Sequence, residues 1–224
     1  MASTSQDLFV AIEAGDVRGV GAILDGHPAA ASSRDASGVS ALMRALYRFD
    51  KALIDAVERC VDTLDVFEAA AFGDVDRLTV LLEEDPPLVA SYSGDGFTAL
   101  HFAAFFGRFE AAELLIDRGA EVDALGRGWM TGTAMHSAVS RLHSDVVRIL
   151  LDAGANPNVR QSGGWTPLHA AAANGDLASV LLLLDAGADL TATNDEGRSV
   201  GDLATESGDT ATADLIRSKL QTAP

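Results

Sequence analysis

A period of 33 to 35 residues runs through this chain, because one sequence pattern returns three times at that distance. The pattern opens with a threonine, at Thr98, Thr133 and Thr166, and a histidine stands three residues after each of them. A glycine follows each threonine after 21 residues, at Gly119 in the first copy. A unit this short cannot bury both of its faces, so the core must come from stacking one unit on the next.

Weaker copies of the same frame extend to both ends of the chain. The threonine position falls at 6, 40, 64, 98, 133, 166 and 199, which gives intervals of 34, 24, 34, 35, 33 and 33 residues. Outside the three strong copies it holds Gln6, Ser40, Leu64 and Ser199. We therefore predict one domain over residues 1–224, built from seven units with approximate bounds 1–34, 35–59, 60–92, 93–127, 128–160, 161–193 and 194–220.

Each strong unit predicts a helix, a tight turn, a second helix and a loop. The threonine hydroxyl suits a helix N-cap, and Pro167 fits the first helical position. Glycines such as Gly107 and Gly119 stand where the two helices should end with positive φ. Small alanines, such as Ala103 and Ala104, recur at helical spacing and let neighbouring helices approach closely. The fold class is therefore all-α.

The sixth unit carries the family resemblance most clearly. It contains Trp165-Thr-Pro-Leu-His-Ala-Ala171 and then Leu182-Leu-Leu-Asp-Ala-Gly-Ala188. This pattern resembles the ankyrin repeat, and the resemblance covers nearly the whole chain, most strongly from about 94 to 190. It implies a solenoid of helix-turn-helix units with short loop or β-turn fingers, the name used here for the loop after each second helix. It also implies that His101, His136 and His169 brace their own helix starts and the adjoining loops.

Three stretches depart from the regular pattern. The interval of 24 residues between Ser40 and Leu64 is about ten short, so we predict a missing finger and a local change in stacking there. Proline-containing loops at His27-Pro28 and Asp85-Pro-Pro87 predict irregular fingers in the N-terminal units. The loop at 124–132 is two residues longer than its counterpart in the next unit.

Charge and composition restrict the classes of partner. The chain has 16 Lys and Arg against 33 Asp and Glu, a formal net charge of −17, which disfavours nucleic acid and anionic membranes. Such a charge suits a basic protein segment as partner, or serves solubility alone. Cys60 is the only cysteine, no apolar run reaches the length of a membrane span, and the first residues show no signal-peptide pattern. The predicted compartment is the cytoplasm.

The residue pattern predicts no catalytic residue, cofactor or metal. Equivalent histidines in stacked units lie about 10 Å apart, whereas zinc ligands lie about 2 Å from one ion. Cys60 is predicted to be a structural thiol on an apolar helix face. His143 is expected at the surface, and Glu13, Glu68 and Glu110 are expected to face solvent.

Aromatic residues stand at positions that vary in the family and line the concave face of the proteins it resembles. Aromatic and arginine side chains are the usual anchors of protein interfaces, so we expect at least three of these rings to be partly exposed. The predicted binding residues are Phe72, Phe97, Phe105, Phe106, Trp129, Arg141 and Trp165.

Three hypotheses about function follow. The favoured one is a protein–protein interaction module that binds through this aromatic concave face. The alternative is a small-molecule binder or enzyme that uses a cleft beneath the 124–132 loop, with polar groups from Arg127, His136, Arg141, His143 and Asp145. A third possibility is a structural unit that only holds other chains in an assembly.

Overall fold

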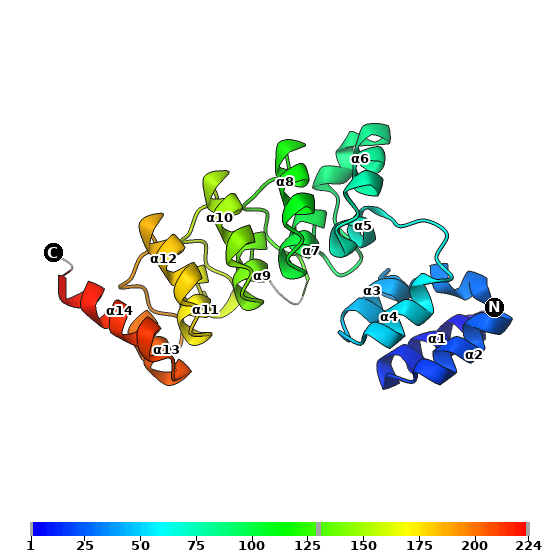
Figure 1. The fold of residues 1–224 in the computed structure, drawn as a ribbon, viewed down its shortest axis with the longest axis horizontal. Coiled ribbons are helices and arrows are strands. Elements are labelled where there is room, and N and C mark those ends of the chain that lie inside the picture. Colours follow the sequence, from blue (N-terminus) through cyan, green and yellow to red (C-terminus); the bar gives the residue numbers. More distant parts are fainter. Residues whose placement is uncertain (1, 129–130, 223–224) are drawn as a thin grey trace. The chain divides into compact units, whose positions relative to one another are not determined.

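The structure is a computed structural model that describes residues 2–128 and 131–222, and it confirms the predicted all-α solenoid. In this described part, helices are the only regular elements, apart from two isolated antiparallel bridges, Arg34 with Ser40 and Thr193 with Ser199. The fourteen α-helices follow one another in seven consecutive pairs (Figure 1). The α-helices are α1 (Ala2–Ala14), α2 (Val17–Gly26), α3 (Ala41–Leu46), α4 (Lys51–Glu58), α5 (Val66–Phe72), α6 (Val75–Glu84), α7 (Ala99–Phe105), α8 (Phe109–Asp117), α9 (Ala134–Ser140), α10 (Ser144–Asp152), α11 (Pro167–Ala173), α12 (Leu177–Asp185), α13 (Val200–Ser207) and α14 (Thr210–Thr222).

The chain divides into two compact units. Unit 1 comprises Met1–Glu68 with Ser93–Asp95, and unit 2 comprises Ala69–Tyr92 with Gly96–Pro224. The boundary falls within α5, close to the interval that is about ten residues short. That all seven helix pairs belong to one domain stays a prediction.

Unit 1 holds the first two helix pairs around a core of buried aliphatic residues. α1 packs on α2 and α3, and α4 packs on α2 and α3, so that Leu8, Ile12, Leu42 and Leu53 are fully buried. The expected helix start at Gln6 is wrong, because α1 already runs through this position from Ala2.

The predicted missing finger is confirmed. α4 ends at Glu58 and α5 begins at Val66, and the intervening residues form a short irregular link. Within unit 1, the turn Ser93–Asp95 instead lies against the tip of the finger that precedes α3. A Cβ on Gly94 would come within 2.1 Å of the Ser37 carbonyl oxygen, and the Tyr47 hydroxyl donates a hydrogen bond to Asp95.

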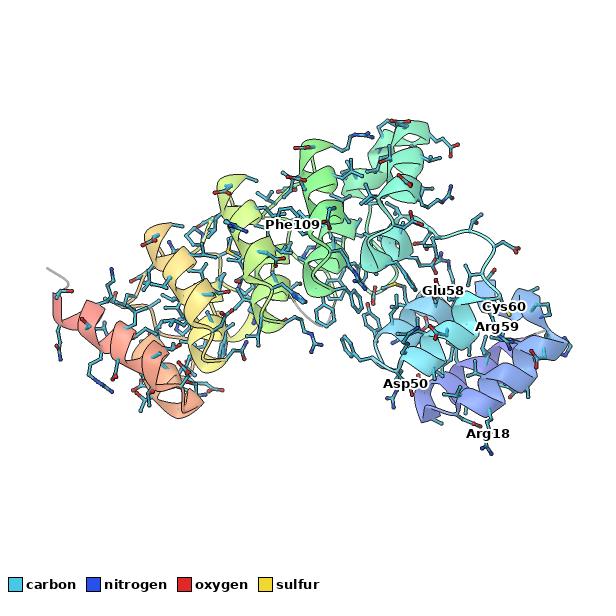
Figure 2. The ribbon with its side chains drawn as sticks, viewed as in Figure 1. Arg18, Asp50, Glu58, Arg59, Cys60 and Phe109 are labelled. Carbon is cyan, nitrogen blue, oxygen red and sulfur yellow. The ribbon has the colours of Figure 1, made fainter. Side chains whose placement is uncertain are left out.

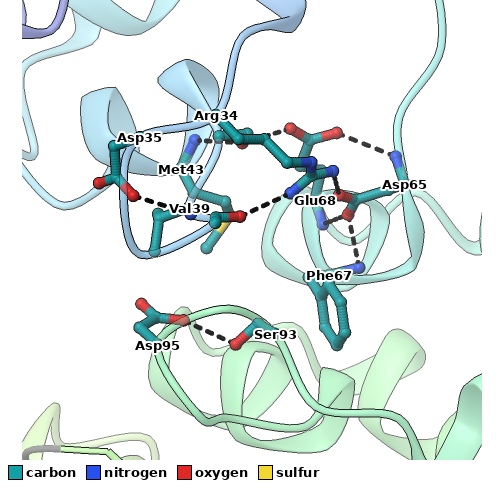
Figure 3. A network of polar contacts seen from close by, with 11 residues as sticks. Arg34, Asp35, Val39, Met43, Asp65, Phe67, Glu68, Ser93 and Asp95 are labelled. Atoms are coloured by element: carbon teal, nitrogen blue, oxygen red, sulfur yellow. Dashed lines mark hydrogen bonds and ion pairs between the residues drawn. The ribbon is translucent and has the colours of Figure 1, made fainter.

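A polar network in unit 1 corrects two expectations (Figure 3). The residue that caps α5 is Asp65 and not Leu64, because the Asp65 carboxylate accepts from the backbone N–H groups of Phe67 and Glu68 at 2.8 Å. Glu68 is buried and not exposed to solvent: its carboxylate accepts from the Ser40 hydroxyl at 2.5 Å and from the Asp65 backbone N–H at 2.9 Å. Burial raises the pKa of Glu68, and the neighbouring charge of Asp65 adds to this rise.

The prediction for Cys60 and the prediction for the proline-containing loops have opposite outcomes. Cys60 lies in the turn after α4 and is partly exposed, so its predicted place on an apolar helix face is wrong (Figure 2). The irregular N-terminal fingers are confirmed, since short 3₁₀ helices, Pro28–Ser32 and Pro86–Ala90, replace the regular glycine ending. A third 3₁₀ turn, Ser162–Gly164, precedes Trp165.

Unit 2 is a double row of helices. The first helices of successive pairs, α7, α9, α11 and α13, pack on one another, and so do the second helices from α6 to α14 (Figure 1). Alanines such as Ala103, Ala138 and Ala171 have no exposed surface between the first helices, while leucines such as Leu115 and Leu150 fill the layer beneath the second helices. Small residues in one row and large ones in the other therefore set the stacking distance.

The predicted helix ends in unit 2 are confirmed. Thr98, Thr133 and Thr166 are the N-caps of α7, α9 and α11. Gly119 and Gly187 follow α8 and α12 with φ of +87° and +86°. A Cβ at either glycine would meet no atom within 4 Å, so the positive φ and not lack of space requires glycine there.

We predict that Ser40→Ala lowers the free energy of unfolding by about 1–3 kcal/mol, because it removes the N-cap of α3 and one donor to a buried carboxylate. Urea denaturation measures this change, with an unchanged m-value. The matched control is Ser199→Ala, which removes an N-cap whose partner Asp202 is exposed. An equal loss in both variants would contradict a contribution from Glu68.

Candidate protein-binding face

The predicted binding residues that the structure describes all belong to unit 2, and most of them lie at the ends of first helices. Phe72 ends α5, Phe105 and Phe106 stand at the end of α7, and Arg141 is the C-cap of α9. Trp165 lies just before the N-cap of α11. We call these five residues the first-helix face. Trp129 lies outside the described residues.

The aromatic residues of the first-helix face retain part of their surface. Phe72, Phe105, Phe106 and Trp165 are all half-buried, so the expectation of at least three partly exposed rings is confirmed. Phe97 is different, since only 5% of it is exposed. Its ring lies 5.6 Å from that of His101 and 6.0 Å from that of Phe102, centroid to centroid. Phe97 therefore packs in the core and does not present a ring to a partner.

An arginine covers part of the exposed aromatic surface at the ends of α7 and α9. The Phe105 and Phe106 rings meet edge to face, with centroids 5.1 Å apart. The Arg141 guanidinium lies 5.4 Å from the Phe105 centroid, within the range of a cation–π contact, and Arg141 as a whole is exposed. The stretch therefore combines apolar area with a positive charge at the surface.

A second pairing of this kind lies on the fingers. The Arg127 guanidinium stands 3.6 Å from the Tyr92 ring centroid, and the Tyr92 hydroxyl donates to the Leu125 carbonyl oxygen at 3.3 Å. Leu125 is 47% exposed. The residue pattern does not reveal this group, because the contact joins residues that are 35 positions apart.

Three buried histidines position this face. The Nδ1 atoms of His101, His136 and His169 accept hydrogen bonds from the backbone N–H groups of their own N-cap threonines at 3.2 to 3.3 Å. The Nε2 atoms of His101 and His136 then reach the carbonyl oxygens of Gly132 and Trp165 in the next unit, at 3.1 and 3.2 Å. The bracing role implied by the family resemblance is confirmed for His101 and His136, and for His169 it is confirmed at its own helix start.

Burial keeps these histidines neutral. Loss of hydration lowers the pKa of His101 and lowers that of His136 from 6.5 to about 4. A neutral ring with its proton on Nε2 satisfies both bonds, because Nδ1 then accepts and Nε2 donates. Each ring is therefore used within the scaffold. Among residues 2–128 and 131–222, no group of three or more His, Cys, Asp or Glu is arranged to hold a metal ion.

The polar groups named for a cleft beneath the 124–132 loop come together only in part, since the charges of Arg141 and Asp145 both act on His143. His136 is buried with both nitrogens in hydrogen bonds, and Arg127 lies on Tyr92. Asp145 is exposed in the first turn of α10. The expectation of a surface position for His143 is wrong in part, because this residue is half-buried and its ring fills the space beside Gly107.

Comparison with protein families decides the identity of the fold. A family model described as ankyrin repeats matches the chain in three overlapping copies, at residues 8–125, 66–161 and 126–194. The chain is an ankyrin-repeat protein. Ankyrin repeats are generally protein–protein interaction modules, and this ankyrin-repeat protein has the repeat's helix caps and histidine bonds.

Relatives of this ankyrin-repeat protein include much longer proteins. It is 40% identical over 102 residues to the E3 ubiquitin-protein ligase XB3 of Oryza sativa subsp. japonica, and 31% identical over 113 residues to the palmitoyltransferase Hip14 of Drosophila melanogaster. These matches cover 44% and 50% of the chain but only 22% and 17% of those proteins. Their named activities are therefore statements about them alone.

A third relative is closer in length. The chain is 33% identical over 144 residues to a Rickettsia felis protein named for ankyrin repeats. This match covers 61% of this chain and 62% of that protein.

Within the described residues, none of the helices of the ankyrin-repeat protein is both long and apolar enough to cross a membrane.

We predict that acidification destabilises this ankyrin-repeat protein through His136. Because the pKa of His136 is lower in the folded state, the stability it contributes is present above pH 6.5 and is lost as the pH falls toward about 4. For a shift of this size the full loss of stability amounts to about 3 kcal/mol. Urea denaturation at pH 7.5 and pH 5 measures the loss. His136→Gln should show a smaller loss than the wild type, whereas His27→Gln, at an exposed loop, should not differ from it. Equal pH dependence in wild type and His136→Gln would disprove the assignment.

Proposed function

We propose that this ankyrin-repeat protein binds a segment of a partner protein through its first-helix face. The observation that carries the proposal is the group of Phe105, Phe106 and Arg141, in which two partly exposed rings and an exposed guanidinium meet at the ends of neighbouring helices. Such rings and guanidinium groups give interfaces much of their binding energy. Trp129 belongs to the proposal by its position in the repeat, and Phe97 supports it only from within the core.

The proposal assigns no catalytic role. Fold alone fixes no function, but the buried histidines of unit 2 are held by hydrogen bonds to the backbone, and Arg127, another of the groups named for a cleft, lies on Tyr92. No specific observation favours small-molecule binding. We further propose the cytoplasm as the place of action, because a single cysteine is typical of proteins without structural disulfides.

The basic partner expected from the net charge is proposed for a different surface. The second helices α6, α8, α10 and α12 contain nine Asp and Glu residues against two arginines. The first helices α7, α9 and α11 contain no Asp, Glu, Lys or Arg. A basic segment would therefore meet the second helices.

Substituting two rings tests the proposed function. Phe105→Ala together with Trp165→Ala should reduce capture of the partner from a native lysate at least about tenfold, while the melting temperature changes little, because both residues are partly exposed. The matched control is Val80→Ala with Leu181→Ala, which truncates two residues that are 43% and 42% exposed on second helices. Capture that is unchanged by the first pair, or reduced equally by both, would refute the proposal.

A further inference from the structure

The ends of α5, α7 and α9 bring two arginines to the exposed phenylalanines. Arg141 lies over Phe105, and the Arg108 side chain donates from Nε to the Ala71 carbonyl oxygen at 2.9 Å, at the end of the preceding first helix. His143 lies near both arginines. Burial lowers the pKa of His143, and the charges of Arg141 and Arg108 lower it further. We call Phe72, Phe105, Phe106, Arg108 and Arg141 the arginine–phenylalanine patch.

The charge around this patch differs from that of the chain as a whole. The helices beneath it, α7 and α9, contain no carboxylate, although the chain has a net charge of −17. The one carboxylate that acts on His143 beside the patch is Asp145, whose Oδ1 accepts from the backbone N–H of Val146 at 2.9 Å. At the ends of α7 and α9, the exposed Arg141 therefore stands beside the partly exposed Phe105.

The geometry of Arg141 suits an anionic oxygen pair. A guanidinium that lies over a ring is restrained in orientation, so less conformational entropy is lost when it forms further hydrogen bonds. Its N–H groups match the two oxygens of a carboxylate, and charge-assisted bonds of this kind are roughly twice as strong as neutral ones. Flanking rings also exclude water from such a bond, as the rim of an interface does.

Resting on the proposed function, we propose that the occupant of the first-helix face is an acidic segment of a partner protein, one in which an Asp or Glu stands beside bulky apolar residues. The carboxylate binds Arg141, and the apolar side chains pack on Phe105 and Phe106. The finger group of Arg127 and Tyr92 offers a second pairing of the same kind. A basic segment has no carboxylate for Arg141 and would be repelled by it.

Selection from a displayed library of random dodecapeptides on the immobilised full chain tests this choice of partner. Peptides eluted from the wild type, after depletion on the Phe105→Ala/Trp165→Ala variant, should be enriched in Asp and Glu together with aromatic or aliphatic residues. Enrichment in Lys or Arg, or no enrichment in acidic residues, overturns the proposal. Selected peptides that bind the wild type and the Phe105→Ala/Trp165→Ala variant equally well would instead count against the proposed function.

A synthetic copy of the most enriched peptide then locates the carboxylate. Fluorescence anisotropy should show about tenfold weaker binding to Arg141→Ala, with an intermediate loss for Arg141→Lys and none for Arg148→Ala, an exposed arginine on α10. Changing the acidic residue of the peptide to its amide should weaken binding to the wild type but not to Arg141→Ala. Additive effects of the two changes, or binding of a single-stranded oligonucleotide with the same dependence on Arg141, overturn the proposal.

Discussion

Neighbouring units are joined in two ways. Buried histidines of one unit form hydrogen bonds to backbone carbonyl oxygens of the next, and the backbones of adjacent turns pack closely. His101 and His136 each bond a carbonyl oxygen of the following unit, and the Gly96 backbone lies so close to Arg127 and Gly128 that a Cβ there would come within 2.6 Å of a backbone atom. In the histidine bonds the acceptors are backbone carbonyl oxygens, which every residue type has. The stack can therefore keep its geometry while the residues at helix ends vary, provided that the rings remain neutral and the turns remain thin.

This constraint confines binding chemistry to a few positions. Most of each first helix is occupied by packing residues: in α11 they are Leu168, Ala171 and Ala172, together with the bracing His169. The positions left for exposed functional groups are the last residues of the first helix and the finger. Aromatic and arginine side chains occupy both places in the middle units, where Phe105 meets Arg141 and Tyr92 meets Arg127.

Local signals predicted most of the fold, and long-range contacts account for what they missed. Caps at Thr98, Thr133 and Thr166 and the missing finger follow from spacing, because helix caps act within one turn. Burial of Glu68 does not, since its partner Ser40 lies 28 residues earlier and belongs to another helix pair. The candidate site shows the same limit. Half-buried Phe105 and buried Phe97 occupy equally variable positions, and Phe97 packs against the rings of His101 and Phe102.

Net charge is a sum, and its distribution matters more for binding than its total. Acidic residues on the second helices repel copies of the same chain, which opposes self-association of a protein that exposes aromatic rings. On the first helices, the absence of carboxylates from α7, α9 and α11 means that no ionised acid on these helices loses its hydration when a partner covers them. Arg141, at the end of α9, is an exposed arginine beside these helices. In the proposed complex it meets a carboxylate of the partner, so the proposal relies on the sign of the local charge and not on that of the whole chain.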